Sequence, residues 1–296
     1  NTFEHVDQLD PLVFCASQDN LLIIDGSTDE FSRYSRINGL SGTNITALRS
    51  DASSQTVWIG YANGRIDVWR NGGFQPITAI EETPSFTGLK QINGFAFFDG
   101  KAYVGTNFGL VEFEISSRLA GRTFLLGDNY SPIAVASFDI NPVGVACVHS
   151  PAPLNEFLVA DITENLPQWN PIDYRVFASV YDPNSLVWYG VDECFLYAAT
   201  DLTSGTLLFN VSENSNGDWE AGTYAQPWGG GSLSQEIQDI RVNNDWLVVT
   251  RDFNVIGKKS DQKNSPVDSV NISNSLFAPG VLRPLSSTFV ASENAF

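Results

Sequence analysis

The chain has 296 residues, of which 43% are hydrophobic and 17% are charged, well below the usual quarter. Long helices rich in Glu, Lys and Arg are therefore disfavoured, whereas 24 glycines and 14 prolines indicate many turns between short strands. The net charge of −18 argues against nucleic-acid binding, because phosphate contacts need clusters of Lys and Arg. No apolar run approaches the roughly 18 residues of a membrane-spanning segment.

The first predicted elements occur twice. Residues 57–69 read VWIGYANGRIDVW, and residues 102–114, AYVGTNFGLVEFE, repeat their pattern 45 residues later. Each phrase holds two alternating runs rich in β-branched and aromatic residues, separated by a polar turn. Such runs predict strands, so each phrase predicts a β-hairpin.

A small residue near the end of the first run marks the repeat. Six copies are predicted at spacings of 44, 45, 44, 41 and 59, and their anchors are Ala16, Gly60, Gly105, His149, Gly190 and Val249. Three or four antiparallel strands in about 45 residues predict one blade of a β-propeller. Small anchors suit positions where the inner strands of the blades crowd together. A large β-sandwich, the alternative all-β fold, needs no such period.

These elements predict an all-β protein with a single β-propeller domain over residues 1–296, built from six or seven four-stranded blades. The last 37 residues hold two short β-like runs. Seven blades are favoured if these runs close with the N-terminal strand near residues 2–6; otherwise a seventh blade continues beyond the given sequence. Because the chain has no methionine and starts with Asn1, it is expected to be a fragment of a longer exported protein.

The spacing of 59 predicts an insertion near residues 203–235. This stretch carries Trp219, Tyr224 and Trp228 beside a run of three glycines. Insertions in repeat proteins map to loops that often form a binding face. These three aromatic residues are therefore the predicted ligand-binding site, where their rings stack on sugar or grip a peptide; the alternative is that they cover the outer edge of a blade.

Residues 37–69, INGLSGTNITALRSDASSQTVWIGYANGRIDVW, resemble the two-component regulator propeller repeat. The positions that match its motif are Gly39, Leu40, Ser41, Ile45, Leu48, Asp51, Trp58, Ile59, Gly60 and Gly64. Residues 20–41 and 90–115 are similar to one branch, the N-terminal propeller of PorZ-type surface proteins of the type IX secretion system. The resemblance implies an exported bacterial protein at the cell surface or in the periplasm. It also implies, as partners, an anionic lipopolysaccharide or other surface glycan, or other proteins of the secretion machinery.

Catalytic and metal-binding patterns are weak. The chain has two histidines, and His149 replaces the glycine of the repeat, which favours a structural role. No G-x-S-x-G sequence or His/Cys metal spacing is present, so no catalytic residue, metal site or cofactor is predicted. Residues 25–30, DGSTDE, resemble a calcium loop only faintly. The three cysteines are expected as buried thiols, with a Cys147–Cys194 bridge as the alternative.

The sequence therefore predicts a non-catalytic propeller that binds a ligand or partner as part of a cell-surface secretion machinery. Two alternatives remain open. One is a periplasmic carbohydrate-sensing propeller of a hybrid two-component system. The other is a propeller-fold polysaccharide lyase or hydrolase, which requires titratable groups clustered at the propeller axis.

Overall fold

A computed structural model describes the chain most fully before residue 172. Backbone and side chains are described for residues 3–28, 30–140, 143–150 and 157–171. Elsewhere the structure describes the backbone of Glu156, the strands beyond residue 171, and residues 215–216. The chain divides into two compact units, residues 1–136 and 137–296. Each unit is considered by itself below.

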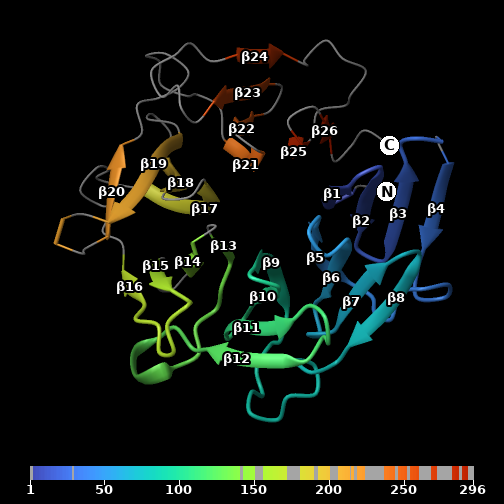
Figure 1. The fold of residues 1–296 in the computed structure, drawn as a ribbon, viewed down its shortest axis with the longest axis horizontal. Helices are drawn as coiled ribbons and strands as arrows, with labels where there is room; N and C mark the ends of the chain where they lie inside the picture. The colour runs from blue at the N-terminus through green and yellow to red at the C-terminus, as the bar shows by residue number, and fades with distance from the viewer. Residues whose placement is uncertain are drawn as a thin grey trace. The chain divides into compact units, whose positions relative to one another are not determined.

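The first unit holds three four-stranded antiparallel sheets whose strands follow one another in chain order (Figure 1). The first sheet consists of β1 (His5–Leu9), β2 (Leu12–Ser17), β3 (Asn20–Asp25) and β4 (Glu30–Tyr34). The second consists of β5 (Ile45–Asp51), β6 (Thr56–Tyr61), β7 (Ile66–Arg70) and β8 (Gly73–Ile77). The third consists of β9 (Ile92–Phe98), β10 (Lys101–Thr106), β11 (Gly109–Glu114) and β12 (Ala120–Phe124).

The second unit repeats the same arrangement within its described strands. Its first sheet consists of β13 (Ser137–Ile140), β14 (Val145–Ser150), β15 (Glu156–Asp161) and β16 (Asn170–Pro171). The next consists of β17 (Tyr181–Tyr189), β18 (Glu193–Thr200), β19 (Thr206–Glu213) and β20 (Trp219–Thr223). Then follow β21 (Ile237–Asn243), β22 (Trp246–Arg251), β23 (Asn254–Lys259) and β24 (Asp268–Asn271). The last sheet is a pair, β25 (Leu282–Ser286) and β26 (Phe289–Ser292).

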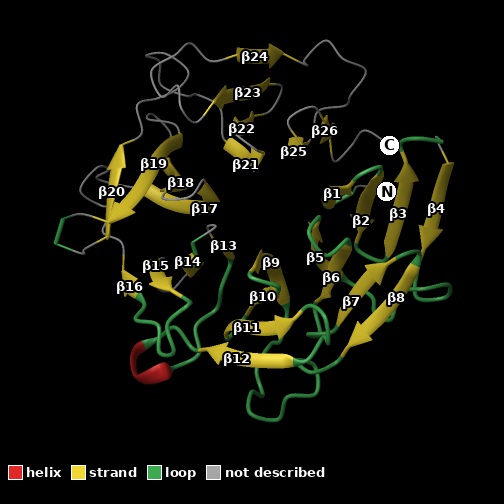
Figure 2. Ribbon diagram, in the orientation of Figure 1, coloured by secondary structure: helices red, strands yellow, loops and turns green. Residues whose placement is uncertain are grey.

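The all-β prediction is confirmed, and the sheets have the strand order of propeller blades. Both quoted phrases form the predicted central hairpin of a sheet, β6–β7 in one case and β10–β11 in the other. In the described part of the chain the one helix is a short 3-10 turn, η1 (Asp128–Tyr130), drawn red in Figure 2. No described helix has the length and apolar character that crossing a membrane requires.

The repeat anchor has a steric reason. A Cβ atom added to Gly60 in β6 would lie 2.4 Å from Cγ2 of Ile92, the first residue of the next sheet. Ala16 occupies the matching position in β2, and it shares a buried cluster with Ile45, which begins the second sheet. Each small residue therefore admits an apolar side chain from the following sheet into van der Waals contact.

Buried side chains fill the space between successive sheets of the first unit. Between the second and third sheets the Trp58 ring lies about 6 Å from the rings of Phe95, Phe97 and Phe113. Between the first and second sheets the rings of Phe14 and Trp69 meet edge to face at 5.0 Å. Because neither core lies within a single sheet, a blade depends on its neighbours for stability.

The predicted anchor of the fifth copy is wrong. LVWYG reaches only the end of β17, the first strand of its sheet, where Tyr189 pairs with Glu193 of β18. The second strands start at residues 12, 56, 101, 145, 193 and 246, so the last two spacings are 48 and 53 residues. The spacing of 59 that located the insertion was measured from a displaced anchor. The insertion near residues 203–235 stays a prediction with less support.

The expected use of the N-terminal strand is also corrected. β1 pairs with β2 and completes the first sheet, whereas the C-terminal runs β25 and β26 pair with each other. This pairing follows from the short β1–β2 turn, which brings His5 opposite Ala16. The choice between six and seven blades stays a prediction.

We expect Gly60→Ala to lower the free energy of unfolding by about 1–3 kcal/mol, the usual range for an overpacked core. The added methyl group would press on Ile92. Gly73→Ala is the matched control, because a Cβ atom there meets nothing closer than 3.7 Å. Urea denaturation of both variants measures the difference. Equal stability of the two variants would contradict the steric account of the anchor.

Candidate functional site

The predicted aromatic site falls mostly outside the described residues. Trp219 begins β20, the outermost strand of its sheet, where its backbone pairs with Glu213 of β19. Tyr224 directly follows that strand, and both Tyr224 and Trp228 lie outside the part of the chain that the structure describes. The site therefore stays a prediction, with the position of the Trp219 backbone as its one described feature.

A hollow of about 260 Å³ lies elsewhere, in the first unit. One wall belongs to residues 78–91, which connect β8 to β9, and the other walls are the β10–β11 turn, β11, β12 and the connection that follows β12. The rings of Phe86 and Phe108 face each other here, with centroids 4.6 Å apart. No sequence motif pointed to this hollow, because its walls come from separate segments.

Polar contacts hold the 78–91 wall in place. The Lys90 ammonium donates hydrogen bonds to the backbone carbonyls of Glu81 and Thr83, each at 2.8 Å. The Glu81 carboxylate accepts hydrogen bonds from the Arg65 guanidinium at 2.8 Å and from the Asn63 amide at 2.7 Å. Asn63 and Arg65 belong to the β6–β7 turn, so this turn fixes the connection that follows its own sheet.

A buried carboxylate holds the other side of the β6–β7 hairpin. Asp67 is fully buried, and its Oδ2 accepts hydrogen bonds from the Tyr61 hydroxyl at 2.6 Å and the Ser41 N–H at 2.7 Å. Burial and the Asp67 charge raise the pKa of Tyr61, so this hydroxyl stays protonated as a donor. Ser41 belongs to the GLS sequence of the repeat. The GLS motif therefore has a structural role, because its Ser41 N–H binds the buried Asp67 carboxylate.

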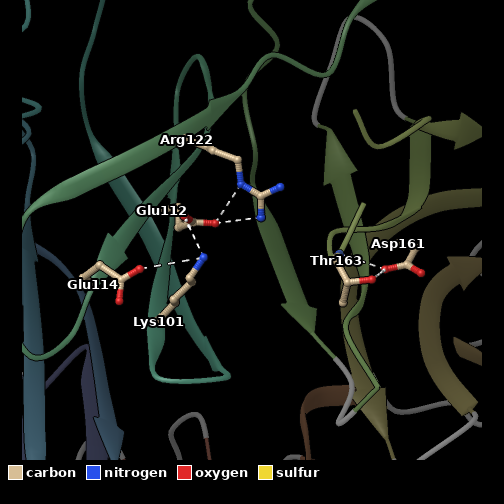
Figure 3. A network of polar contacts seen from close by, with 6 residues as sticks. All are labelled: Lys101, Glu112, Glu114, Arg122, Asp161 and Thr163. Carbon is tan, nitrogen blue, oxygen red and sulfur yellow. Dashed lines mark hydrogen bonds and ion pairs between the residues drawn. The ribbon is translucent and has the colours of Figure 1, made fainter. Parts of the chain in front are cut away.

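Figure 3 shows a second network, on the third sheet. Glu112 of β11 accepts hydrogen bonds from Arg122 at 2.9 and 3.1 Å and from Lys101 at 3.1 Å. Burial alone would raise the pKa of Glu112, but the hydrogen bonds from Arg122 and Lys101 outweigh it and hold the pKa below its ordinary value. Burial and the Glu112 charge raise the pKa of Tyr103 to about 12. At neutral pH Glu112 is therefore ionised and Tyr103 is protonated, and this fits a structural role for the network.

Two further carboxylates stabilise turns. Asp25 accepts hydrogen bonds from the N–H and hydroxyl of Ser27, and Asp161 does the same with Thr163 (Figure 3). Each aspartate ends the third strand of its sheet, so the calcium-like DGSTDE sequence contains a recurring turn. Among the described residues no three His, Cys, Asp or Glu side chains form a group suited to a metal ion.

Three further reactive side chains in the described part of the chain are buried in strands. His149 is buried in β14, and its ring lies 4.9 Å from that of Phe157. Cys15 and Cys147 are buried in β2 and β14, and burial raises the pKa of Cys15 to about 12. The Cys15 thiol is therefore unreactive at neutral pH. The Cys147–Cys194 alternative stays a prediction, because the Cys194 side chain lies outside the described residues.

The family is shown by comparison with known domains. The family model of the PorZ N-terminal β-propeller domain (TSS9) matches residues 13–168, more than half of the chain. The chain therefore belongs to this β-propeller family, as its repeat suggested. No curated protein matches the sequence significantly.

Solved structures share the fold at low sequence identity. PorZ, an essential bacterial surface component of the type IX secretion system of Porphyromonas gingivalis, matches with a TM-score of 0.66 and 15% identity over 92% of this chain and 33% of its own. The extracellular domain of the putative hybrid two-component system BT4673 from B. thetaiotaomicron matches with a TM-score of 0.62 and 15% identity. The match covers 93% of this chain and 34% of the BT4673 chain. The RRP9 WD40 repeats match with a TM-score of 0.63 and 12% identity, over 91% of this chain and 79% of the RRP9 chain. The chain thus spans about a third of the PorZ structure.

We expect Glu112→Gln to destabilise the fold by about 1.5–3 kcal/mol at pH 7, the range for hydrogen bonds to charged groups. The pKa of Glu112 lies below its value in the unfolded chain, so the ionised carboxylate stabilises the fold at neutral pH. This contribution is fully present above the unfolded-state pKa and is lost as the pH falls through the lowered folded-state pKa. The variant and the parent should therefore converge in acid.

Urea denaturation at pH 7 and near pH 3 measures this convergence. Glu114→Gln is the matched control on the same strand, because Glu114 is 49% exposed and its ion pair with Lys101 is 3.8 Å long. It should change stability little at either pH. A stability gap for Glu112→Gln that stayed constant with pH would show that the carboxylate charge does not support the fold.

Proposed function

We propose that the chain is a non-catalytic binding propeller of a bacterial cell-surface machinery, similar in role to the N-terminal propeller of PorZ. The observation that carries this proposal is the family match over residues 13–168. The buried Glu112 carboxylate agrees with a structural role, because Arg122 and Lys101 donate hydrogen bonds to it.

The proposed setting is outside the cytoplasm, at the cell surface or in the periplasm. The PorZ structure is that of a surface component of a secretion system, and the BT4673 structure is an extracellular domain. A surface glycan or lipopolysaccharide, or another protein of the secretion machinery, is the proposed partner. The strongly negative charge suits a protein partner with basic residues better than an anionic glycan, unless the glycan is bound through uncharged sugar rings.

The proposed glycan contact is the aromatic stretch that begins with Trp219. Aromatic rings offer flat apolar faces, and neighbouring glycines leave room for a ligand to approach the backbone. Trp219 begins an edge strand of its sheet, and Tyr224 and Trp228 follow within nine residues of the sequence.

We expect the double variant Trp219→Ala/Trp228→Ala to bind immobilised lipopolysaccharide from the encoding bacterium at least ten-fold more weakly than the parent. Loss of two stacking rings removes more than the 1.4 kcal/mol that a ten-fold change requires. Biolayer interferometry measures the affinity, and thermal denaturation checks that the variant is folded. Phe31→Ala is the control, because Phe31 is an aromatic residue of the outer strand β4 and is 73% exposed.

Two outcomes would overturn parts of this proposal. If the double variant binds as the parent does, the site is elsewhere. If the parent itself binds neither lipopolysaccharide nor a purified protein of the secretion machinery, the proposed function is wrong.

A further inference from the structure

We infer that the hollow of the first unit receives one large apolar side chain of a polypeptide partner that carries basic residues beside this anchor. The inference rests on the proposed binding function and names the chemistry of a protein partner. It concerns residues 78–132 and is independent of the aromatic stretch around Trp219.

The lining of the hollow is mainly hydrocarbon. Its apolar lining residues are Ala79, Ile80, Phe86, Phe108, Val111, Ala120, Leu125 and Pro132. Its polar lining residues are Thr83, Ser85 and Thr123, and no charged side chain lines it. A charged group would lose its hydration here without an opposite charge to replace it. The inserted group is therefore uncharged and mostly apolar.

The size of the hollow suits a single side chain. Its volume of about 260 Å³ lies below the range of roughly 300–1,000 Å³ typical of small-molecule sites. An engineered apolar cavity of about 150 Å³ is enough for benzene. A Leu or Phe side chain therefore fits with its backbone at the mouth. Protein interfaces obtain most of their affinity from such anchors in preformed pockets.

The hollow is preformed rather than dependent on closure around its occupant. Lys90 and Arg65 hold the 78–91 wall through the contacts described above, and the rings of the lining residues Phe86 and Phe108 pack on each other. A wall that is already ordered loses little conformational entropy when a partner docks.

Charges on the two connections that form the walls specify the neighbours of the anchor. The two connections that form the walls expose Glu82, next to the lining residue Thr83, and Asp128, four residues before the lining residue Pro132. Lys90 is the one basic residue of these connections, and its ammonium donates hydrogen bonds to backbone carbonyls of the 78–91 wall. Exposed carboxylates on these connections and the net charge of −18 favour an anchor flanked by Lys or Arg.

Exposed apolar side chains extend the surface beyond the hollow. Leu89 is 75% exposed and Tyr130 is 66% exposed, and they belong to the same two connections. Surface residues of this kind supply the contacts that surround an anchor and exclude water from it. The partner is therefore expected to cover these connections as well as to fill the hollow.

The test is a titration of the ¹⁵N-labelled full chain with the capped peptide acetyl-Lys-Leu-Lys-amide, followed by amide chemical shifts. We expect saturable shifts at Thr83, Phe108 and Leu125. Acetyl-Lys-Ala-Lys-amide should bind at least ten-fold more weakly, because burial of a leucine side chain contributes more than the 1.4 kcal/mol of a ten-fold change. Acetyl-Glu-Leu-Glu-amide should also bind at least ten-fold more weakly, through repulsion at the mouth.

Variants of the chain separate the anchor from the charges. Ala120→Phe places a ring in the hollow from an exposed position of β12, and it should abolish the shifts. Ala52→Phe, at an exposed position of the β5–β6 turn, is the matched control and should bind as the parent does. Glu82→Lys should weaken binding of the lysine peptide and strengthen binding of the glutamate peptide.

Three results would overturn the inference. One is equal binding of the leucine and alanine peptides. Another is unchanged binding by Ala120→Phe. The third is saturable shifts at the same amides with glucose but not with the leucine peptide, which would make the hollow a saccharide site. This titration uses no lipopolysaccharide or secretion protein, so it fails or succeeds separately from the test of the proposed function.

Discussion

The close approach of each sheet to the one before it is the constraint on which the rest of the first unit depends. Ile92 begins the third sheet and packs on the bare backbone of Gly60, and its carbonyl accepts a hydrogen bond of 2.7 Å from the Thr46 hydroxyl. One repeat earlier, Ile45 begins the second sheet and shares a buried cluster with Ala16. Its N–H donates a hydrogen bond of 2.7 Å to the Gln18 carbonyl. These contacts therefore join successive repeats at the same place in each sheet.

The same constraint explains how much of the fold the sequence predicts. A small residue between two alternating runs is a local signal, so the first four anchors, Ala16 to His149, fall in second strands as expected. The signal failed at Gly190 because both inner strands of a blade are apolar and rich in β-branched residues. LVWYG therefore looks like VWIGY although it ends a first strand. Only the pairing of strands, which no local pattern contains, separates the two cases.

The candidate sites show a different limit. Sequence reasoning identifies Trp219, Tyr224 and Trp228 because three aromatic residues cluster within ten positions. The hollow gives no such signal: Phe86 belongs to the 78–91 connection and Phe108 to the β10–β11 turn, and their rings meet only in the folded chain. The contact between Arg65 and Glu81 that fixes this connection is likewise formed between a turn and a loop. Sites of this kind can be found only after the sheets are placed.

The distribution of polar groups indicates where recognition can occur. Within the described sheets, Asp67 and Glu112 hold neighbouring strands and loops together, and substituting either removes internal hydrogen bonds. The strands thus have little freedom to acquire a binding role. The connections are under weaker constraint, because a few polar contacts such as those of Lys90 suffice to order them. Exposed side chains of connections vary more freely than those of strands, and this agrees with placing the proposed partner contact at the hollow.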